Sequence, residues 1–457
     1  MHYKIEQTYN LSFYSFYGNS LMQEKSFLEK NFALLYCSGV AVSFLFMLWY
    51  ADHQLVHGDQ WQMLQKGYIA AYTGHWIHYG NVASGFFHVM GSFLTAAVAL
   101  PLMLVDSPWS PMVFVLFLRI CAFLLIDAVL KNMFKPAVRL GFLVIFLFSP
   151  WILFESILYN PSYLAFCAAL HLFTAYKMKD KKSIVYMLLH VLSIGVALQC
   201  HNSWIILPLI SCYLWYRNII KISWIGVFLG SALVLISLIP FAIELMHNSA
   251  LQVPQHRDNA HSVFFGFTHV YPILKAIIYW LRYASLLFSN KIVTRANFDF
   301  LSDISWLQWV MHYLWMVVVF AIGCVTVVFS AKINWRLWVA IKGKIKRSHI
   351  AVGDKDWLAL YAVGGFIAMI IGAGLSPIIF NYWHLSLVMI TAMIPMIFFM
   401  SHYIEKKPKK FVQYLTILAL YFFVVNLNAS LNSFKYSYDA NYSAQVEEGI
   451  QSIQRTR

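Results

Sequence analysis

The sequence predicts an all-α protein, a polytopic bundle of transmembrane helices with amphipathic helices in the membrane interface of its first outer loop. Hydrophobic residues make up 60% of its 457 residues and charged residues only 11%, whereas soluble domains carry about 25% charged residues. About eleven or twelve stretches are apolar over the roughly 20 residues that a helix needs to cross a bilayer. Helices are expected because an α-helix satisfies its own backbone groups in lipid.

The apolar runs, taken in order, justify the individual helices. The first run, 32–50, follows a mixed, polar segment without a small-residue cleavage site, so we expect an uncleaved signal anchor. The later runs are 84–105, 112–130, 140–154, 161–176, 183–199, 203–216, 222–244, 306–330, 356–375, 384–402 and 411–428, with a mixed aromatic segment at 265–289. The six cysteines lie in apolar stretches without a CxxC pair, which indicates packing residues and neither a zinc site nor a disulfide framework.

The polar stretch 51–80 interrupts this pattern directly after the first run, and it carries two aspartates and four histidines. From Asp59 onward, aromatic and aliphatic residues recur at helical spacing, which predicts an amphipathic interfacial helix over 59–73. Gly74 stands where such a helix ends. Polar groups are rarely concentrated in so apolar a chain without a use, so we expect 51–80 to form one wall of an active site.

Basic residues between the apolar runs indicate the topology, because cytoplasmic loops are enriched in lysine and arginine. The net charge of +14 is therefore interpreted as orientation, and no nucleic-acid partner is expected. The basic clusters at 131–139, 177–182 and 217–221 share the cytoplasmic side with the N-terminus only if 84–105 does not cross the bilayer. We therefore expect 84–105 to be re-entrant or interfacial. The segments expected to share the outer side are 51–80, 155–160, 200–203, 245–305 and 376–383.

Four segments carry a family resemblance. They are GDQWQMLQKGYIAAYTGHWIHYGNVASGFFHVMG (58–91), LRICAFLLIDAVL through SPWILFESILYNPSYLAF (118–166), ALQCHNSWIILPLI (197–210) and PIIFNYWHLSLVMITAMIP (377–395). In this order they resemble segments of the GT-C fold integral-membrane glycosyltransferases, in particular the bacterial branch with aminoarabinose and galacturonic acid transferases and protein O-mannosyltransferases. The resemblance covers roughly 45–245 well and the rest loosely.

Three positions depart from the family pattern. Gln60 stands where many relatives have a second acidic residue, and Pro161–Ser162 stands where they have proline-aspartate. His201 stands where relatives often have a lysine. The second acidic residue and the contact to the lipid phosphate are therefore the least determined parts of the comparison.

The resemblance implies an enzyme that moves a sugar from a polyprenyl-phosphate carrier to an extracytoplasmic acceptor, which is a cell-envelope glycan, lipid A or a protein. It implies a multi-pass protein of the bacterial inner membrane, with a cytoplasmic N-terminus and an active site on the outer face. The expected regions are a cytoplasmic N-terminal segment (1–31), a catalytic membrane module (32–245), an outer loop with an interfacial helix followed by variable C-terminal spans (246–428), and a polar tail (429–457). No phosphate loop or nucleotide-binding fingerprint occurs, so no nucleotide cofactor is expected.

Two carboxylates are the expected catalytic residues, Asp59 and Glu155. Asp59 is expected to deprotonate or orient the acceptor hydroxyl, although a capping role at the start of the helix would also explain it. Glu155 is either a second acidic residue of the site or a helix-end residue that reaches water. Mg²⁺ or Mn²⁺ prefers carboxylate oxygens, so a divalent cation would involve Asp59 and Glu155.

Six further residues are expected to bind the substrate or the carrier: His201, Asn202, Lys275, Arg282, Tyr382 and His384. His201 with Asn202 contacts the carrier phosphate or merely forms a hairpin turn. Lys275 and Arg282 share one helical face, where they bind a phosphate or extend to the interface. The last two, Tyr382 and His384, line the site or belong to an aromatic belt.

Other polar residues have plainer explanations. Asp52, His53 and His57 resemble a metal cluster in spacing, but interfacial loops favour such residues in any case. Arg119 and Asp127 lie within one span and are expected to be buried, internally paired and structural. Two other functions stay open: a lipid-linked polysaccharide polymerase or ligase, and a transporter or flippase, which would show internal repeats and charges at mid-span.

Overall fold

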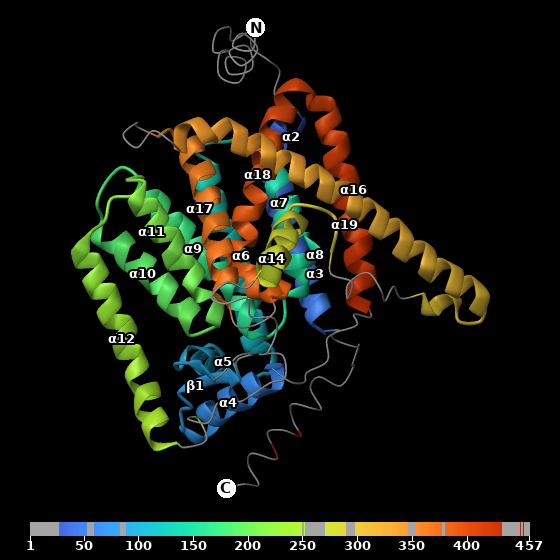
Figure 1. The fold of residues 1–457 in the computed structure, drawn as a ribbon. Coiled ribbons are helices and arrows are strands. Elements are labelled where there is room, and N and C mark those ends of the chain that lie inside the picture. The colour runs from blue at the N-terminus through green and yellow to red at the C-terminus, as the bar shows by residue number, and fades with distance from the viewer. Residues whose placement is uncertain are drawn as a thin grey trace.

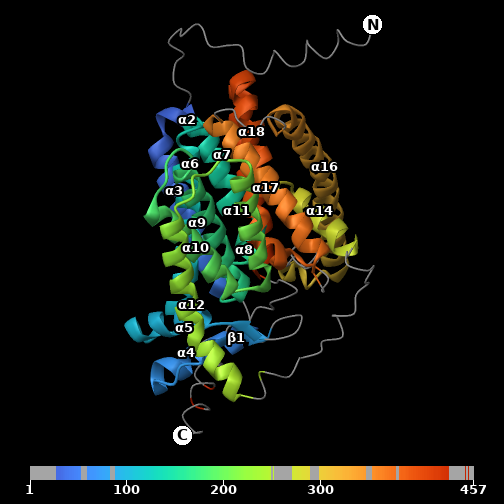
Figure 2. The ribbon, with the colours of Figure 1, turned by 60° about the vertical axis from the view of Figure 1, so that its left-hand side comes forward.

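The computed structural model consists of a bundle of helices with a smaller layer against one end of it (Figures 1 and 2). It describes residues 27–52, 59–82, 88–248, 251, 270–288, 298–345, 352–376, 380–431, 448 and 451. Within these residues the chain is almost entirely helical, so the expected all-α bundle is confirmed. A two-stranded antiparallel hairpin in the smaller layer is the exception that the sequence did not predict.

The bundle contains most of the helices. Those before residue 250 are α2 (Phe27–Lys30), α3 (Phe32–Asp52), α6 (Trp109–Leu130), α7 (Pro136–Leu147), α8 (Pro150–Phe154), η1 (Asn160–Tyr163), α9 (Leu164–Lys177), α10 (Ile184–Leu198), η2 (Asn202–Ile205), α11 (Ile206–Tyr216) and α12 (Trp224–His247). Those after it are α14 (Val270–Tyr283), η4 (Asp299–Leu301), α16 (Ser305–Ile345), α17 (Asp354–Gly374), η5 (Tyr382–Val388), α18 (Met389–Lys406) and α19 (Pro408–Leu431).

Eight helical segments in the described part of the chain are long and apolar enough to cross a membrane. The sequence predicted about eleven or twelve, because 161–176, 183–199 and 203–216 were each taken as a span. These runs form α9, α10 and α11, which have 14, 15 and 11 residues. The 3₁₀ turns η1 and η2 precede α9 and α11 and shorten both helices.

Helix α16 is longer than the sequence predicted. It has 41 residues, which corresponds to about 60 Å at 1.5 Å per residue, twice the roughly 30 Å of a hydrocarbon core. It runs obliquely past the other helices (Figure 1). The predicted run ended at 330, but no proline or glycine follows until Gly343, so nothing in the backbone stops the helix there.

The smaller layer, which we call the interfacial layer, consists of α4 (Asp59–Thr73), β1 (Tyr79–Val82), β2 (His88–Met90) and α5 (Phe93–Leu104). Helix α4 has the predicted bounds and ends before Gly74, whose φ of +69° suits glycine. Gly67 permits the close approach of α5, because a Cβ there would lie 2.3 Å from Cγ1 of Val98. Helix α5 has 12 residues, about 18 Å, so it is too short to span.

The basic loops meet at the end of the bundle away from the interfacial layer (Figure 2). The Lys221 N–H donates to Met178 O at 2.8 Å, and Lys179 forms an ion pair with Asp354. Lys355 lies 5.3 Å from the centroid of the Phe134 ring, beside the first basic cluster. The three clusters thus lie at one end of the bundle, and the expectation that 84–105 does not cross the bilayer stays a prediction.

Arg119 and Asp127 are both buried, as expected, and each has a partner on another element. Asp127 accepts hydrogen bonds from Arg139 at Nε (2.7 Å) and from the Tyr36 hydroxyl (2.9 Å). Arg119 instead donates from Nη2 to the backbone oxygen of Glu155 at 2.8 Å. Arg139, which the sequence assigned to a loop cluster, thus belongs partly to the buried structure.

Two further histidines form a hydrogen-bonded network in the middle of the bundle. The rings of His171 (α9) and His190 (α10) are buried, with centroids 4.0 Å apart. Ser211 of α11 donates to Leu207 O at 3.1 Å, so its Oγ accepts from Nε2 of both histidines, at 2.8 and 2.9 Å. Nδ1 of His171 accepts from the Tyr361 hydroxyl of α17 at 2.8 Å. The network therefore joins four helices.

Candidate active site

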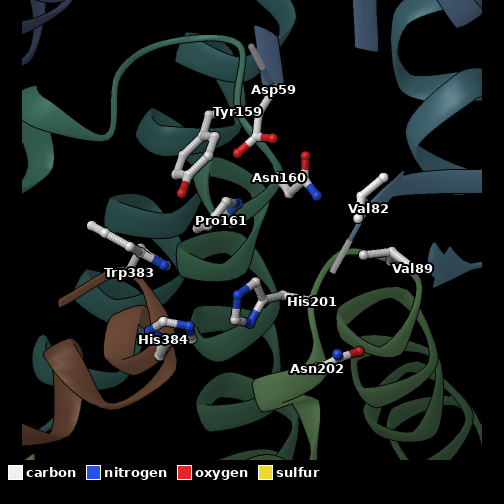
Figure 3. A pocket seen from close by; sticks show the side chains of 10 residues that line it. All are labelled: Asp59, Val82, Val89, Tyr159, Asn160, Pro161, His201, Asn202, Trp383 and His384. Carbon is white, nitrogen blue, oxygen red and sulfur yellow. The ribbon is translucent and has the colours of Figure 1, made fainter. Parts of the chain in front are cut away.

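A pocket lies where the interfacial layer meets the bundle, and it opens to the surface (Figure 3). Its described lining comes from four parts of the chain. The lining residues are Asp59, Val82, Val89, Tyr159, Asn160, Pro161, His201, Asn202, Trp383 and His384. Four of the eight expected site residues are among them, namely Asp59, His201, Asn202 and His384.

Asp59 is the first residue of α4, so its carboxylate lies at the positive end of the helix dipole. The Asn81 side chain of β1 donates from Nδ2 to the backbone oxygen of Asp59 at 2.8 Å. The same Nδ2 donates to Oδ1 of Asn160 at 2.9 Å. Asn81 therefore ties the start of α4 to the turn η1, which places two pocket residues from distant segments side by side.

His201 has an extended backbone and directly precedes η2, and its side chain is turned to the pocket (Figure 3). Its Nδ1 accepts the Ser203 N–H at 3.1 Å, so the ring proton of the neutral imidazole is on Nε2. Burial lowers the pKa of His201 to about 4. The ring is therefore neutral at pH 7 and acts as a hydrogen-bond donor without a positive charge.

His384 is held in the same way from the other side of the pocket. It lies in the first turn of η5, where its Nδ1 accepts the Asn381 N–H at 2.9 Å as part of a capping box. Its ring is 5.3 Å from that of His201, centroid to centroid. Trp383, next to it, is partly exposed in the pocket. The two imidazoles thus lie next to each other although they come from opposite halves of the chain.

Glu155 lies beside the pocket and is not one of its lining residues. It is buried, and its backbone oxygen accepts from Arg119 and, at 2.6 Å, from the Ser162 hydroxyl. Tyr159 lies within the electrostatic reach of both expected carboxylates. Burial first, and then the charges of Glu155 and Asp59, raise the pKa of Tyr159 well above its usual value, so the phenol stays protonated.

The remaining expected residues, Lys275, Arg282 and Tyr382, also lie outside the lining. Lys275 donates to Oδ1 of Asn381 at 3.2 Å, next to the cap that holds His384. Arg282 donates to the backbone oxygens of Leu287 (3.2 Å) and Phe288, and it stacks over aromatic rings. Tyr382 is buried, and its backbone oxygen accepts from the Tyr283 hydroxyl at 2.6 Å. These contacts support the walls of the pocket.

Lys66 is the main charged residue near the pocket that the sequence did not single out. Its Nζ donates to Gly80 O at 2.5 Å and lies 4.7 Å from the centroid of the Tyr79 ring. Burial lowers the pKa of Lys66 to about 8, while the charges of Glu244 and Asp59 partly offset this effect. Glu244, at the end of α12, accepts the His78 N–H at 2.9 Å and so joins α12 to the interfacial layer.

Tyr159, Trp383 and Asn81 were also not singled out as site residues. Tyr159 and Trp383 fall within the quoted segments SILYNPSY and NYWH, so their position beside a candidate residue was the available signal. Asn81 gave no signal, because its role depends on a hairpin that the sequence did not predict. His53 and His57, the two histidines of the suggested metal cluster, lie outside the described residues.

A cation held by both Asp59 and Glu155 stays a prediction. Asp59 lines the pocket, whereas the buried Glu155 does not. In the described part of the chain, no group of three or more His, Cys, Asp or Glu side chains is placed to hold a metal ion. We therefore assign no step of the chemistry to a metal.

Comparisons with known proteins give a likeness at the level of the fold. No family model matches the chain, and no curated protein matches its sequence. The chain is similar to the crystal structure of ArnT from Cupriavidus metallidurans bound to undecaprenyl phosphate, with 12% identity and a TM-score of 0.46 over 92% of this chain and 75% of that chain. For ArnT in the apo state the values are 13%, 0.41, 87% and 75%. Both likenesses concern the arrangement of the helices.

Proposed function

We propose that the protein is a membrane glycosyltransferase that transfers a sugar from a polyprenyl-phosphate carrier to an acceptor at the membrane surface. The observation that carries this proposal is the convergence of Asp59, His201 and His384 on one pocket. They come from three of the four segments in which the sequence resembles GT-C glycosyltransferases. No described lining residue comes from 246–305, the region that would favour a polysaccharide polymerase or ligase.

The chemistry follows from the groups that line the pocket. The Asp59 carboxylate takes the proton of the acceptor hydroxyl as that oxygen forms a bond to the anomeric carbon of the sugar. The bond from this carbon to the phosphate oxygen breaks, and its electron pair leaves with the polyprenyl phosphate. The Nε2–H of His201 donates to a phosphate oxygen as this charge develops, and the adjacent His384 ring packs beside it.

The test is the variant Asp59→Asn, which keeps the shape of the side chain and removes its basicity. We expect sugar transfer to fall by about 10²–10⁴-fold, the usual contribution of a general base. The matched control is Asp106→Asn, an exposed aspartate that follows α5 and bonds to Tyr72. Mass spectrometry of envelope glycans from a deletion strain complemented with each gene measures transfer. Full activity of Asp59→Asn at normal expression would remove Asp59 from the mechanism.

A further inference from the structure

We propose that Gln199 is a positioning residue, which holds the interfacial layer against the bundle and so fixes the position of Asp59 relative to His201. The inference rests on the proposed function, because it concerns the placement of the proposed base. Gln199 is the residue that ends α10, its side chain is buried, and it stands two residues before His201 in the chain.

The side chain of Gln199 lies directly against the backbone of the interfacial layer at the start of α5. Its Oε1 accepts the Phe93 N–H at 3.2 Å. Gly91 has a φ of +88°, and a Cβ at that position would lie 2.3 Å from the same Oε1. Glycine is suited to both the backbone conformation and the close approach. The layer and the bundle therefore meet here with one side chain against bare backbone.

The bond to Phe93 supplies a partner that α5 does not have from its own chain end. Phe93 is the first residue of α5, and the first N–H groups of a helix have no acceptor within the helix. Ser92 precedes it and forms no side-chain capping bond, because its Oγ is bonded to Nδ1 of His78 at 2.8 Å. The bundle, through Gln199, therefore satisfies a buried donor of the layer.

A third element sets the orientation of the Gln199 amide. Ser237 of α12 donates its hydroxyl proton to Val234 O at 2.7 Å, so its Oγ accepts from Nε2 of Gln199 at 2.9 Å. With Nε2 directed to α12, Oε1 faces Phe93. Helix α12 runs from the bundle to the interfacial layer (Figures 1 and 2), so Gln199 is held where all three parts meet.

The position of the layer at this contact is passed on to Asp59. Strand β2 ends directly before Gly91, and it pairs with β1. From β1, Asn81 donates to the backbone oxygen of Asp59 at 2.8 Å. His201 instead moves with α10, since its N–H donates to Ala197 O at 2.9 Å. A shift of the layer against Gln199 would therefore displace Asp59 and leave His201 in place.

The test uses full-length variants in the deletion strain. Gln199→Met keeps the length of the side chain and removes both hydrogen bonds. We expect the rate at which the sugar appears on envelope glycans, per amount of folded protein, to fall by about 10–100-fold, since a base misplaced by about 1 Å can cost 10²-fold. Gln199→Asn, which is one methylene shorter, should behave in the same way. Unchanged transfer in both variants would overturn the inference.

Two further readouts separate positioning from a general loss of structure. Gln199→Glu has the same length and keeps an acceptor for the Phe93 N–H, so its transfer should exceed that of Gln199→Met by about threefold or more. The dissociation constant for purified polyprenyl phosphate in nanodiscs should stay within about twofold in Gln199→Met, because the contact of His201 is kept. Equal transfer by the Glu and Met variants, or lost binding, would contradict the positioning role.

A double-mutant cycle with Asp59→Asn completes the test. If Gln199 acts through Asp59, then Gln199→Met should change the residual transfer of Asp59→Asn by less than about threefold. The same fall in both backgrounds would overturn the inference and leave the proposed function intact. Full transfer by Asp59→Asn alone would count against the proposed function itself.

Discussion

The two histidine pairs of this protein occupy opposite settings, although all four rings belong to one chain and are largely shielded from solvent. Both ring nitrogens of His171, and both of His190, bond to hydroxyl groups of the bundle. In the pocket pair, His201 and His384, Nδ1 of each ring is bound to a backbone N–H. The first arrangement uses the imidazole as a link between helices. The second fixes the orientation of the ring at the wall of the pocket.

The difference in bonding indicates that the bundle pair contributes to stability and the pocket pair to activity. A histidine that is bonded at both nitrogens inside the protein contributes to the free energy of unfolding, and its loss leaves buried hydroxyls without partners. The described hydrogen bonds of the pocket histidines are local, to residues two or three positions away, so they join no distant helices. The comparison therefore predicts opposite phenotypes for substitutions of the same residue type.

The largest effect is expected from His171→Phe. This change keeps a ring but removes the hydrogen-bond partner of the buried Tyr361 hydroxyl, while Ser211 keeps its bonds to His190 and Leu207. One buried group without its partner costs roughly 1–3 kcal/mol, so the melting temperature in detergent should fall by about 1–3 °C. His201→Ala, measured beside it, should melt like the natural protein. A His171→Phe protein with an unchanged melting temperature would end the assignment of this pair to the fold.

The next effect concerns activity and the tautomer of His201. His201→Ala should lose about 10–100-fold in transfer, the value of a hydrogen bond to a charged group. His201→Gln should stay within about tenfold of the natural enzyme, because its amide N–H reaches the place of Nε2, whereas His201→Asn should resemble Ala. Burial lowers the pKa of His201 to about 4. Titration of His201 should therefore cause no inflection near pH 6.5 in the pH profile of transfer, and His201→Ala should leave the shape of that profile near pH 6.5 unchanged. Equal activity of the Gln and Ala variants would contradict the donor role.

The smallest effect concerns Lys66, whose pKa burial lowers to about 8. Below that pH its charge attracts Asp59 and Glu244, with Tyr79 and His88 beside it. As the charge is lost above pH 8, KM for the anionic donor should rise by about threefold. Lys66→Met should have the higher KM at every pH, without an inflection near pH 8. Measurement of KM from pH 6 to 10 for both proteins decides this.

The stability of the protein should rise with pH above pH 8, although the binding of the donor weakens there. The folded pKa of Lys66, about 8, lies below its unfolded value of about 10.4, so between these values the unfolded state binds more protons. The contribution of Lys66 to stability is therefore least favourable below pH 8 and rises from pH 8 to about 10.4. Relative to Lys66→Met, the natural protein should gain melting temperature over this window. A relative loss there would contradict the assigned pKa.

Most of the helices could be predicted from local pattern. Asp59 and Gly74 bracket α4 in the sequence as they do in the structure, because a helix start and a left-handed glycine are decided within a few residues. The prediction that 84–105 does not cross the bilayer rests on the side on which lysines gather, a property of the whole chain that needs no contacts. The lengths of the helices were less predictable where the 3₁₀ turns η1 and η2 interrupt apolar runs, since hydropathy does not register the turn.

Some residues of the pocket could be predicted from the sequence and others could not. Asp59, His201, Asn202 and His384 are unusual where they stand, so the sequence drew attention to them. In the sequence, Lys66 is indistinguishable from an ordinary interfacial lysine. Only the fold shows that the end of α12 places Glu244 near it. The pocket also takes Trp383 and His384 from beyond the expected catalytic module 32–245, so that boundary, which remains a prediction, does not enclose the whole site.

The hydrogen-bonded network in the bundle has a consequence for how the protein is made. His171 and Tyr361 are 190 residues apart, so ribosomal synthesis delivers α9, α10 and α11 long before α17. Until α17 arrives, Nδ1 of His171 lacks its final donor, and no water is present in hydrocarbon to replace it. The insertion of α17 is therefore the event that completes this part of the bundle during biogenesis. A nascent chain arrested before residue 361 would hold three of the four helices in an unfinished state.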